Sequence, residues 1–241
     1  MSPAGALRPL EARVTRKRLV NASGDRVEIL GAISLRLERG QTGVLIGPSG
    51  CGKSTLLRIV AGLDTDYEGS VTRPEGPLAM VFQEPRLLPW RSVEQNIRLA
   101  APQIAEAELV DMLAALALTD HRAHFPGELS LGLARRVAIA RAFAVRPVLL
   151  PLDEPFASLD APLARTMQRE LLALAAARAT TVLLVTHNAD EAAQLADRIW
   201  LLSPRPARIV EEIAVVRPRE AMSEAEALAL KARIAARQAA S

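Results

Sequence analysis

A glycine-rich segment, Gly47-Pro-Ser-Gly-Cys-Gly-Lys-Ser54, constrains the fold of this chain more than any other feature. An apolar run, Thr42–Ile46, precedes it, and a helical pattern, Lys53–Val60, follows it. The glycines let the backbone curl so that successive N–H groups face one anion, and the start of the helix adds the positive end of its dipole. A strand, an anion-binding turn and a helix in this order predict an α/β domain that binds phosphate groups.

Each residue of this segment, a P-loop, has an expected role in holding the phosphates of a nucleotide. Lys53 should reach the β- and γ-phosphates, and the Ser54 hydroxyl should ligate Mg²⁺. Cys51 should offer its backbone amide, because no histidine–acid pair is visibly arranged to activate its thiol. The motif favours a P-loop NTPase over an ordinary glycine turn, but it does not choose among kinases, GTPases and transporters. The predicted nucleotide-binding residues of the loop are Gly47, Pro48, Ser49, Gly50, Cys51, Gly52, Lys53, Ser54 and Thr55.

Two acidic residues, Asp153 and Glu154, directly follow another apolar run, Val148–Leu152. Ligands of open α/β sheets bind at the carboxyl ends of the strands. Asp153 is therefore placed to hold Mg²⁺, directly or through water, and Glu154 to polarise the attacking water as general base. Such a pair is often only the polar start of a loop, but the earlier P-loop favours the functional interpretation. Pro151 should disturb this strand, because proline has no backbone N–H.

Short apolar runs alternate with helical patterns along most of the chain. Most runs are apolar throughout, as in strands of a mostly parallel sheet that is covered on both faces. The predicted fold class is α/β, a P-loop NTPase core with a mostly parallel sheet, an antiparallel β portion and an inserted α-helical subdomain. The predicted strands are Thr42–Ile46, Leu78–Phe82, Val148–Leu152, Thr181–Val185 and Arg198–Leu202, and a hairpin joins Trp200–Leu202 to Arg208–Ile213. The predicted helices are Lys53–Val60, Leu131–Val145, Pro162–Ala177 and Ala189–Ala196.

This pattern divides the chain into three predicted regions. Residues 1–85 and 146–215 form the nucleotide-binding α/β core, and residues 86–145 form the helical subdomain. Residues 216–241 form a C-terminal helical extension, which begins at a capping box made by Ser223 and Glu226.

The composition limits the other classes of function. Half of the 241 residues are hydrophobic and 24% are charged, as in ordinary globular proteins. No apolar run approaches the roughly 20 residues that span a bilayer, and no signal peptide is evident, so the chain is expected in the cytosol. The single cysteine excludes an internal disulfide and a multi-cysteine metal site. The net charge of +3 is scattered among acidic residues, so no nucleic-acid partner is expected.

Four further segments resemble, in order and spacing, the motifs of the ABC ATPase family. They are the Q-loop (Val81–Pro85, with Gln83), the signature motif (Glu128–Arg136, with Ser130 and Gly132), the D-loop (Phe156–Asp160) and the switch histidine (Val185–His187). Each match alone is weak, because glutamine and histidine are common in solvated loops. Six motifs in the family's order, across nearly the whole chain, identify it as a member.

The resemblance implies an ATPase that pairs head to tail with a second copy of itself. Each ATP would lie between the P-loop of one copy and the signature of the other, where Ser130 and the helix after Gly132 meet the γ-phosphate. Asp160 would link the two sites across the interface. ATP and Mg²⁺ are the implied cofactors. The implied catalytic residues are Glu154, His187 and Gln83, and the implied metal ligands are Ser54, Gln83 and Asp153.

The resemblance also implies membrane partners. Such a subunit lies on the cytoplasmic face of the cell membrane, bound to integral membrane permease subunits that work with a periplasmic or surface solute-binding protein. The segments Gln83–Ile97 and Leu202–Ile209 resemble those of nitrate, taurine and alkanesulfonate importers. Leu87, Leu88 and Trp90 are therefore candidate docking residues for the permease. Burial in the core of the subdomain is an equally open alternative for these three.

The sequence departs from the family pattern at two places. Leu131 and Leu133 stand where the signature usually has its first glycine and its glutamine, and Leu131 adds bulk near a close backbone approach. The aromatic residue that usually stacks on adenine corresponds to Leu19, and residues 1–66 contain no Phe, Tyr or Trp.

Two alternatives to a transporter ATPase remain. A soluble ABC ATPase of DNA repair would need a long heptad-bearing insertion, and one of translation would need two cassettes; this sequence has neither. A hydrolysis-impaired paralogue is the second alternative, against which the retained Lys53, Asp153, Glu154 and His187 argue.

Overall fold

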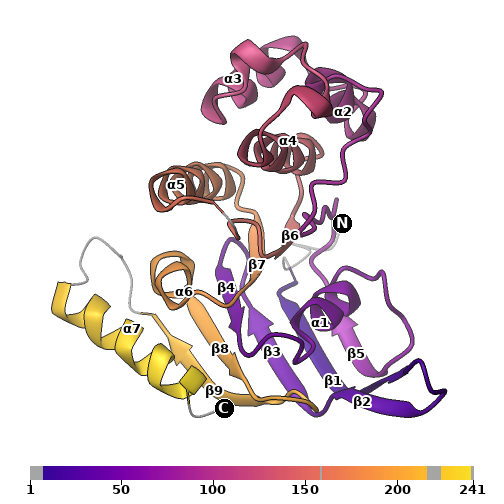
Figure 1. Ribbon diagram of the computed structural model, residues 1–241, viewed down its shortest axis with the longest axis vertical. Coiled ribbons are helices and arrows are strands. Elements are labelled where there is room, and N and C mark those ends of the chain that lie inside the picture. Colours follow the sequence, from indigo (N-terminus) through magenta and orange to yellow (C-terminus); the bar gives the residue numbers. More distant parts are fainter. Residues whose placement is uncertain (1–7, 158, 216–223, 240–241) are drawn as a thin grey trace, which may run out of the picture. The chain divides into compact units, whose positions relative to one another are not determined.

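The computed structural model describes residues 8–157, 159–215 and 224–239 (Figure 1). Its internal contacts divide the chain into two compact units, one made of residues 1–75 and 181–241 and the other of residues 76–180. The second unit is thus inserted into the first along the sequence. The predicted helical subdomain, residues 86–145, lies inside the second unit, and its boundaries stay a prediction. No helix among the described residues is both long and apolar enough to cross a membrane.

The first unit contains an antiparallel sheet near the start of the chain. The long strand β1 pairs with β3 and β5 through its first half and with β2 through its second half. Buried and exposed residues alternate along β3, where Ile33, Leu35 and Leu37 face the core and Arg36 faces solvent. The strands are β1 (Leu10–Val20), β2 (Arg26–Leu30), β3 (Ile33–Leu37) and β5 (Glu68–Thr72).

A second sheet of the first unit carries β4 (Thr42–Ile46) between two parallel neighbours, β7 (Thr181–Thr186) and β8 (Arg198–Leu202). Every residue of β4 and β7 is buried, as the uninterrupted apolar runs predict. The strand β9 (Ile209–Ala214) pairs antiparallel with β8, which confirms the predicted hairpin.

Among the described residues of the first unit, three helices accompany these strands (Figure 1). They are α1 (Lys53–Val60), α6 (Ala189–Leu195) and α7 (Glu224–Ala239). The helix α6 packs on β4, and α7 packs on α6 and β8. Ile234 of α7 is fully buried, and Lys231 forms an ion pair of 2.7 Å with Asp190. A helix thus lies within the predicted C-terminal extension, whose bounds stay a prediction, and Ser223 of the predicted capping box lies outside the described residues.

The second unit is mainly helical, with α2 and α3 packed on α4. Its elements are α2 (Val93–Ala100), α3 (Glu106–Ala115), the 3₁₀ turns η1 (Thr119–His121) and η2 (Pro126–Glu128), α4 (Leu131–Ala144), β6 (Leu149–Asp153) and α5 (Ala161–Ala177). Residues 86–145 are all described and contain no strand, as predicted.

The predicted strand Leu78–Phe82 is wrong: this segment forms two isolated parallel bridges with β6. The Val81 amide donates to the Pro151 carbonyl (3.0 Å), and the Asp153 amide donates to the Val81 carbonyl (2.9 Å). A regular parallel ladder would continue with a bond from residue 151 to the Ala79 carbonyl. Proline has no N–H to donate, so Pro151 interrupts the ladder where the sequence predicts a disturbance.

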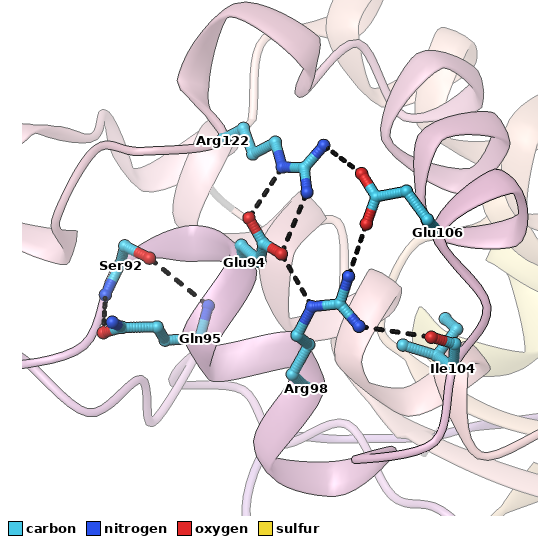
Figure 2. Close-up of polar contacts among 7 residues, drawn as sticks. All are labelled: Ser92, Glu94, Gln95, Arg98, Ile104, Glu106 and Arg122. Atoms are coloured by element: carbon cyan, nitrogen blue, oxygen red, sulfur yellow. Dashed lines mark hydrogen bonds and ion pairs between the residues drawn. The ribbon is translucent and has the colours of Figure 1, made fainter.

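Four charged side chains in the helical part of the second unit form a closed ring of hydrogen bonds and ion pairs (Figure 2). Arg98 and Arg122 each bond to both Glu94 and Glu106, over distances of 2.6 to 2.9 Å. Hydrogen bonds from Arg122 and then from Arg98 lower the pKa of Glu94 to about 2. Ser92 and Gln95 form a reciprocal capping box at the start of the same helix, α2. The ring joins three consecutive segments of this unit: α2, the start of α3 and Arg122, the residue after η1.

Candidate functional site

The phosphate loop connects β4 to α1, and its glycines take conformations that other residues avoid. Gly50 and Gly52 have φ values of +75° and +124°. A Cβ on Gly52 would lie 2.7 Å from Leu30 Cδ2 and 2.9 Å from Ile29 Cγ2. A Cβ on Gly47 would lie 3.0 Å from the carbonyl oxygen of Leu202. These three positions therefore require glycine, for conformational freedom or for lack of space.

Lys53 opens helix α1 and turns its side chain back onto the loop. The residue is 5% exposed, and its ammonium group donates to the carbonyl oxygens of Gly47 and Pro48, each at 2.8 Å. The ammonium group is thus held inside the curve of the loop, at the start of α1. A phosphate bound there would meet both the Lys53 charge and the positive end of the helix dipole. Ser49, Gly50 and Ser54 are exposed.

Cys51 lies on the inner side of the phosphate loop. The residue is 2% exposed, and burial raises the pKa of its thiol, although the charges of Lys53 and Arg205 oppose this shift. A buried thiol with a raised pKa is a poor nucleophile. The interpretation of Cys51 as a structural part of the loop agrees with this environment.

His187 directly follows β7 in the same unit as the phosphate loop. It is exposed, between two residues with fixed side chains. The Thr186 hydroxyl donates to Glu191 (2.5 Å), and the Asn188 side chain accepts from the Asp190 amide (2.8 Å) at the start of α6. A histidine at a strand end, just before a capped helix, projects from a well-defined backbone.

Asp153 and Glu154 end β6 in the second unit. Asp153 is buried, and its amide is bonded to Val81. Glu154 is partly exposed and has a φ of +44°, in the left-handed region that costs a residue with a side chain about 1–2 kcal/mol. Such strain is characteristic of functional positions.

Gln83 lies two residues beyond Val81, so it leaves the parallel bridge in the same direction as Asp153. Gln83 is exposed, but the chain beyond it is anchored. Arg141 of α4 donates to the carbonyl oxygens of Pro85 and Arg86, each at 2.9 Å. The Arg86 guanidinium lies 4.1 Å from the centre of the Phe82 ring. The structure thus brings Gln83 and the acidic pair to one end of the second unit.

The segment from residue 87 to residue 92 has a second anchor, Asn96 of α2, which is fully buried. Its side chain accepts from the Leu88 amide (2.8 Å) and donates to the carbonyl oxygens of Leu88, Arg91 and Ser92. Trp90, between these contacts, is 67% exposed. Burial in the core is therefore wrong for Trp90, and Leu87 and Leu88 are only half-buried.

The signature segment forms the start of α4. Ser130 is the N-cap, and its hydroxyl accepts from the Leu133 amide at 3.3 Å. Gly132 is buried, and a Cβ there would lie 2.9 Å from Leu163 Cδ2. Leu131 is 49% exposed, so its bulk points largely to solvent and leaves the close approach at Gly132 intact.

Asp160 is the N-cap of α5, and its carboxylate accepts from the Leu163 amide at 2.9 Å. The family resemblance places Asp160 at an interface between two copies. Within this chain, its carboxylate caps helix α5. Ser158 of the same motif lies outside the described residues.

Leu19 stands near the end of β1, opposite Val27 of β2. It is 43% exposed, and its neighbours Val20 and Val27 are exposed as well. The described residues before Tyr67 contain no aromatic side chain. This edge therefore offers a base only aliphatic contacts.

Three arginines that contact or lie near the predicted site residues are not predicted from the sequence. Arg141 and Arg205 contact backbone carbonyls 55 and 155 residues away, which no local pattern reveals. Arg135 of α4 is buried, and its Nε and Nη1 have no hydrogen-bond partner within the described part of the chain. Burial lowers the pKa of Arg135, and the charge of Glu154 opposes this shift. The buried guanidinium of Arg135 thus lies within electrostatic range of the Glu154 carboxylate.

Each of the three predicted metal ligands carries an oxygen donor of a kind that suits Mg²⁺. Hydroxyl, amide and carboxylate oxygens, as in Ser54, Gln83 and Asp153, suit this ion, which usually takes one or two carboxylates together with substrate phosphates. Among the described residues, no group of three or more His, Cys, Asp or Glu could hold a metal by itself.

Comparison with known proteins places the chain in a family. The profile of the ABC transporter family matches residues 30–157. The chain therefore belongs to the ABC transporter family, as an ATP-binding, ATP-hydrolysing subunit. A dimeric bacterial ABC transporter cassette, MJ0796, has a similar fold, with a TM-score of 0.77 and 25% identity over 87% of this chain and all of that one.

Its relatives include several ATP-binding proteins for the import of aliphatic sulfonates. SsuB 2 of Pseudomonas syringae pv. tomato is 45% identical over 207 residues, which cover 86% of this chain and 87% of the relative. SsuB 1 of Pseudomonas syringae pv. syringae is 47% identical over 188 residues, covering 78% and 79%. SsuB 2 of Burkholderia cenocepacia is 41% identical over 239 residues, covering 91% and 87%.

Proposed function

We propose that this chain hydrolyses ATP to drive an importer of aliphatic sulfonates. The relatives at 41–47% identity support this choice of solute, because each is named for such import. The observation that carries the ATPase function is the phosphate loop, whose glycines take left-handed conformations around the buried Lys53 ammonium. The same chain carries the strained acidic residue Glu154 after a buried strand.

In the proposed mechanism, the loop residues bind the phosphates first. The backbone from Ser49 to Gly52 supplies N–H donors, and Lys53 exchanges the Gly47 and Pro48 carbonyls for the β- and γ-phosphates. Mg²⁺, when bound, neutralises charge that develops on the phosphate oxygens. Ser54, Gln83 and Asp153 are its proposed ligands.

Hydrolysis then requires a base and a group at the γ-phosphate. Glu154 accepts the proton of the attacking water, while Gln83 orients that water and His187 contacts the γ-phosphate. The left-handed backbone of Glu154 supports this assignment, because it fixes the direction in which the carboxylate leaves the strand.

The active form is proposed to be a head-to-tail dimer of two copies. Ser130 and the start of α4 after Gly132 would bind the γ-phosphate of the partner copy's ATP, as anions bind at helix starts. Asp160 would link the two sites. The dimeric cassette with a similar fold supports this arrangement.

The membrane partners are proposed to be permease subunits at the cytoplasmic face, which receive the sulfonate from a periplasmic or surface binding protein. Trp90 supports this proposal, because it is 67% exposed on a loop anchored by Asn96 and Arg141. An exposed indole on a fixed backbone is a common anchor of protein interfaces. Leu87 and Leu88 would flank it. No nucleic-acid partner is proposed.

Reconstitution with the permease and binding protein tests this function. Vesicles that contain the complete transporter should take up an alkanesulfonate in an ATP-dependent way, and unlabelled alkanesulfonate should compete. Taurine and nitrate, the other solutes of similar importers, serve as competitors. Preferential uptake of nitrate, or ATPase activity that never depends on a permease, would contradict the proposal and favour another solute or a soluble ATPase. ATP binding without hydrolysis in the complete transporter would favour the impaired paralogue.

A further inference from the structure

A side chain outside the sequence motifs contacts the phosphate loop. Arg205, in the turn between β8 and β9, donates from Nε to the carbonyl oxygen of Gly50. Its Nη2 lies 3.8 Å from the position that a Cβ on Gly50 would take. The contact joins residues 155 apart in the sequence and reaches the exposed apex of the loop.

The turn that carries Arg205 is held in place by its own backbone. The Ser203 amide donates to the Arg208 carbonyl (3.0 Å), and the Arg208 amide donates to the Ser203 hydroxyl (3.1 Å). Ala207 exchanges two hydrogen bonds of 2.9 Å with the end of β2, one with the Ile29 carbonyl and one with the Gly31 amide. Arg205 therefore projects toward the loop from an anchored base.

The contact fixes one peptide group of the cradle. The Gly50 carbonyl and the Cys51 amide belong to the same planar peptide. Arg205 holds the oxygen, and the Pro48 carbonyl accepts from the amide at 3.3 Å. Gly50, with φ of +75°, has no side chain to limit rotation of this peptide. A donor from outside the loop supplies the restraint that glycine lacks.

Arg205 also adds positive charge to the cradle. A guanidinium stays charged at any physiological pH. Its field reaches the loop, because Arg205 opposes the burial that raises the pKa of Cys51. Exposed contacts of this kind contribute little to folding stability. The consequence of the contact is therefore expected in phosphate binding rather than in stability.

We propose that Arg205 is a positioning residue of the nucleotide site, which orients the Gly50–Cys51 peptide for phosphate and adds a second cation to that of Lys53. The proposal rests on ATP binding at the phosphate loop. It extends the site to the turn after β8, a segment that no nucleotide-binding motif includes.

The test compares Arg205→Gln with Arg208→Gln, which removes the same charge from the same turn. Arg208 packs its side chain over Gly31 instead of the loop. In calorimetric titrations, Arg205→Gln should weaken ATP and ADP binding about three- to tenfold, the scale of one ordinary hydrogen bond. Arg208→Gln should stay within about twofold of the unsubstituted chain, and Arg205→Lys should restore much of the loss.

Three further measurements separate positioning from a structural role. Arg205→Gln should raise KM for ATP with kcat unchanged, because it alters binding and not the chemical step. It should leave adenosine binding unchanged. It should also move the pH profile of Cys51 alkylation to higher pH, whereas Arg208→Gln should not. Unchanged ATP affinity in Arg205→Gln, an equal loss in Arg208→Gln, or an equal loss for adenosine would overturn the proposal. Failure of the unsubstituted chain to bind ATP would instead contradict the proposed function.

Discussion

The phosphate loop and the loop from Gln83 to Ser92 are both short connections, but they are fixed in opposite ways. The phosphate loop is shaped mainly by its own residues, through glycines with positive φ and the Lys53 ammonium that folds back on Gly47. The second loop is held by side chains from other elements, Arg141 of α4 and Asn96 of α2. A substitution within the phosphate loop should therefore change ligand binding without unfolding the chain. Loss of a side chain that holds the second loop should instead lower the free energy of unfolding.

The largest expected effect tests chemistry at a third connection, after β6. Glu154→Gln keeps the shape of the side chain and removes the proton acceptor, so hydrolysis should fall by about 10²–10⁴-fold. ATP binding should persist, and a dimer should accumulate in ATP. Steady-state phosphate release and size-exclusion chromatography with ATP measure these outcomes. Turnover above a tenth of the original would place the base elsewhere.

Glu154→Gly is the matched variant for backbone strain. Its φ of +44° suits glycine better than glutamate. The glycine variant should be inactive yet at least as stable as the original chain, because strain is removed with the carboxylate. A lower melting temperature would show that the side chain of Glu154 stabilises this turn.

The next effect concerns the locally encoded loop. Lys53→Ala should weaken Mg·ATP binding roughly ten- to hundredfold, since it removes hydrogen bonds from a charged donor worth about 1.5–3 kcal/mol. Calorimetric titration measures the affinity, and chemical denaturation should show a much smaller change in stability. Unchanged affinity would refute the role of Lys53.

A stability effect is expected at the loop held from outside. Asn96→Ala removes four hydrogen bonds from a fully buried position and leaves the Leu88 amide without its acceptor. It should lower the free energy of unfolding by about 1–3 kcal/mol, measured with urea. Gln95→Ala is the control one residue away; it removes an exposed capping contact, and its cost should stay below about 1 kcal/mol. Equal costs would mean that Asn96 does not anchor the loop.

The same contrast explains how far the sequence predicts this molecule. The phosphate loop, the acidic pair, β4, α1 and the hairpin of β8 and β9 follow from local patterns, and the structure contains the predicted elements. The antiparallel strands β1, β2, β3 and β5 are not among the strands predicted from sequence, because polar residues interrupt their apolar ones and β5 is mostly exposed. At Pro151 the sequence predicts only a local irregularity of the strand, and not the interrupted hydrogen-bond ladder between β6 and residues 78–82.

The anchors of the site were not predictable in the same way. Arg141, Arg205 and Asn96 act on backbone carbonyls through contacts that depend on tertiary structure. In the sequence, nothing distinguishes these two arginines from the other arginines of the chain. Residue type and spacing identify groups that meet a ligand, whereas side chains that hold those groups in place become visible only in the fold.

The charged ring of Figure 2 gives a smaller, pH-dependent effect on the helices beyond the second loop. The pKa of Glu94 is about 2 in the folded chain, below the roughly 4.3 of an unfolded glutamate. A depressed folded pKa contributes stability that is present above the unfolded value and is lost as pH falls through the folded value. The helices of this unit should therefore lose stability between about pH 4.3 and pH 2.

Glu94→Gln should flatten this part of the stability profile, measured by thermal melts at stepped pH. Glu75→Gln is the control, because its side chain is 86% exposed and lies 4.0 Å from Arg8. An unchanged slope in Glu94→Gln would mean that the ring contributes no linked protonation.

The smallest expected effect lies at the predicted adenine contact, Leu19. This position is fixed neither by glycines of a loop nor by side chains from distant elements. Leu19 and Val27 face each other at a half-exposed edge, and no aromatic ring stands among residues 1–66. Phosphates and Mg²⁺ should therefore supply most of the binding free energy, and ATP and GTP should bind within about tenfold of each other, or ~1.4 kcal/mol.

Stacking is worth roughly 1–3 kcal/mol per base, and a half-exposed ring should give the low end of that range. Leu19→Tyr should thus tighten ATP binding about fivefold in calorimetric titrations, without a change in kcat, because the base is the same in the ground and transition states. Leu19→Ile is the control for side-chain volume. A strong preference for ATP in the unsubstituted chain, or no response to Leu19→Tyr, would mean that another element, such as the partner copy, holds the adenine.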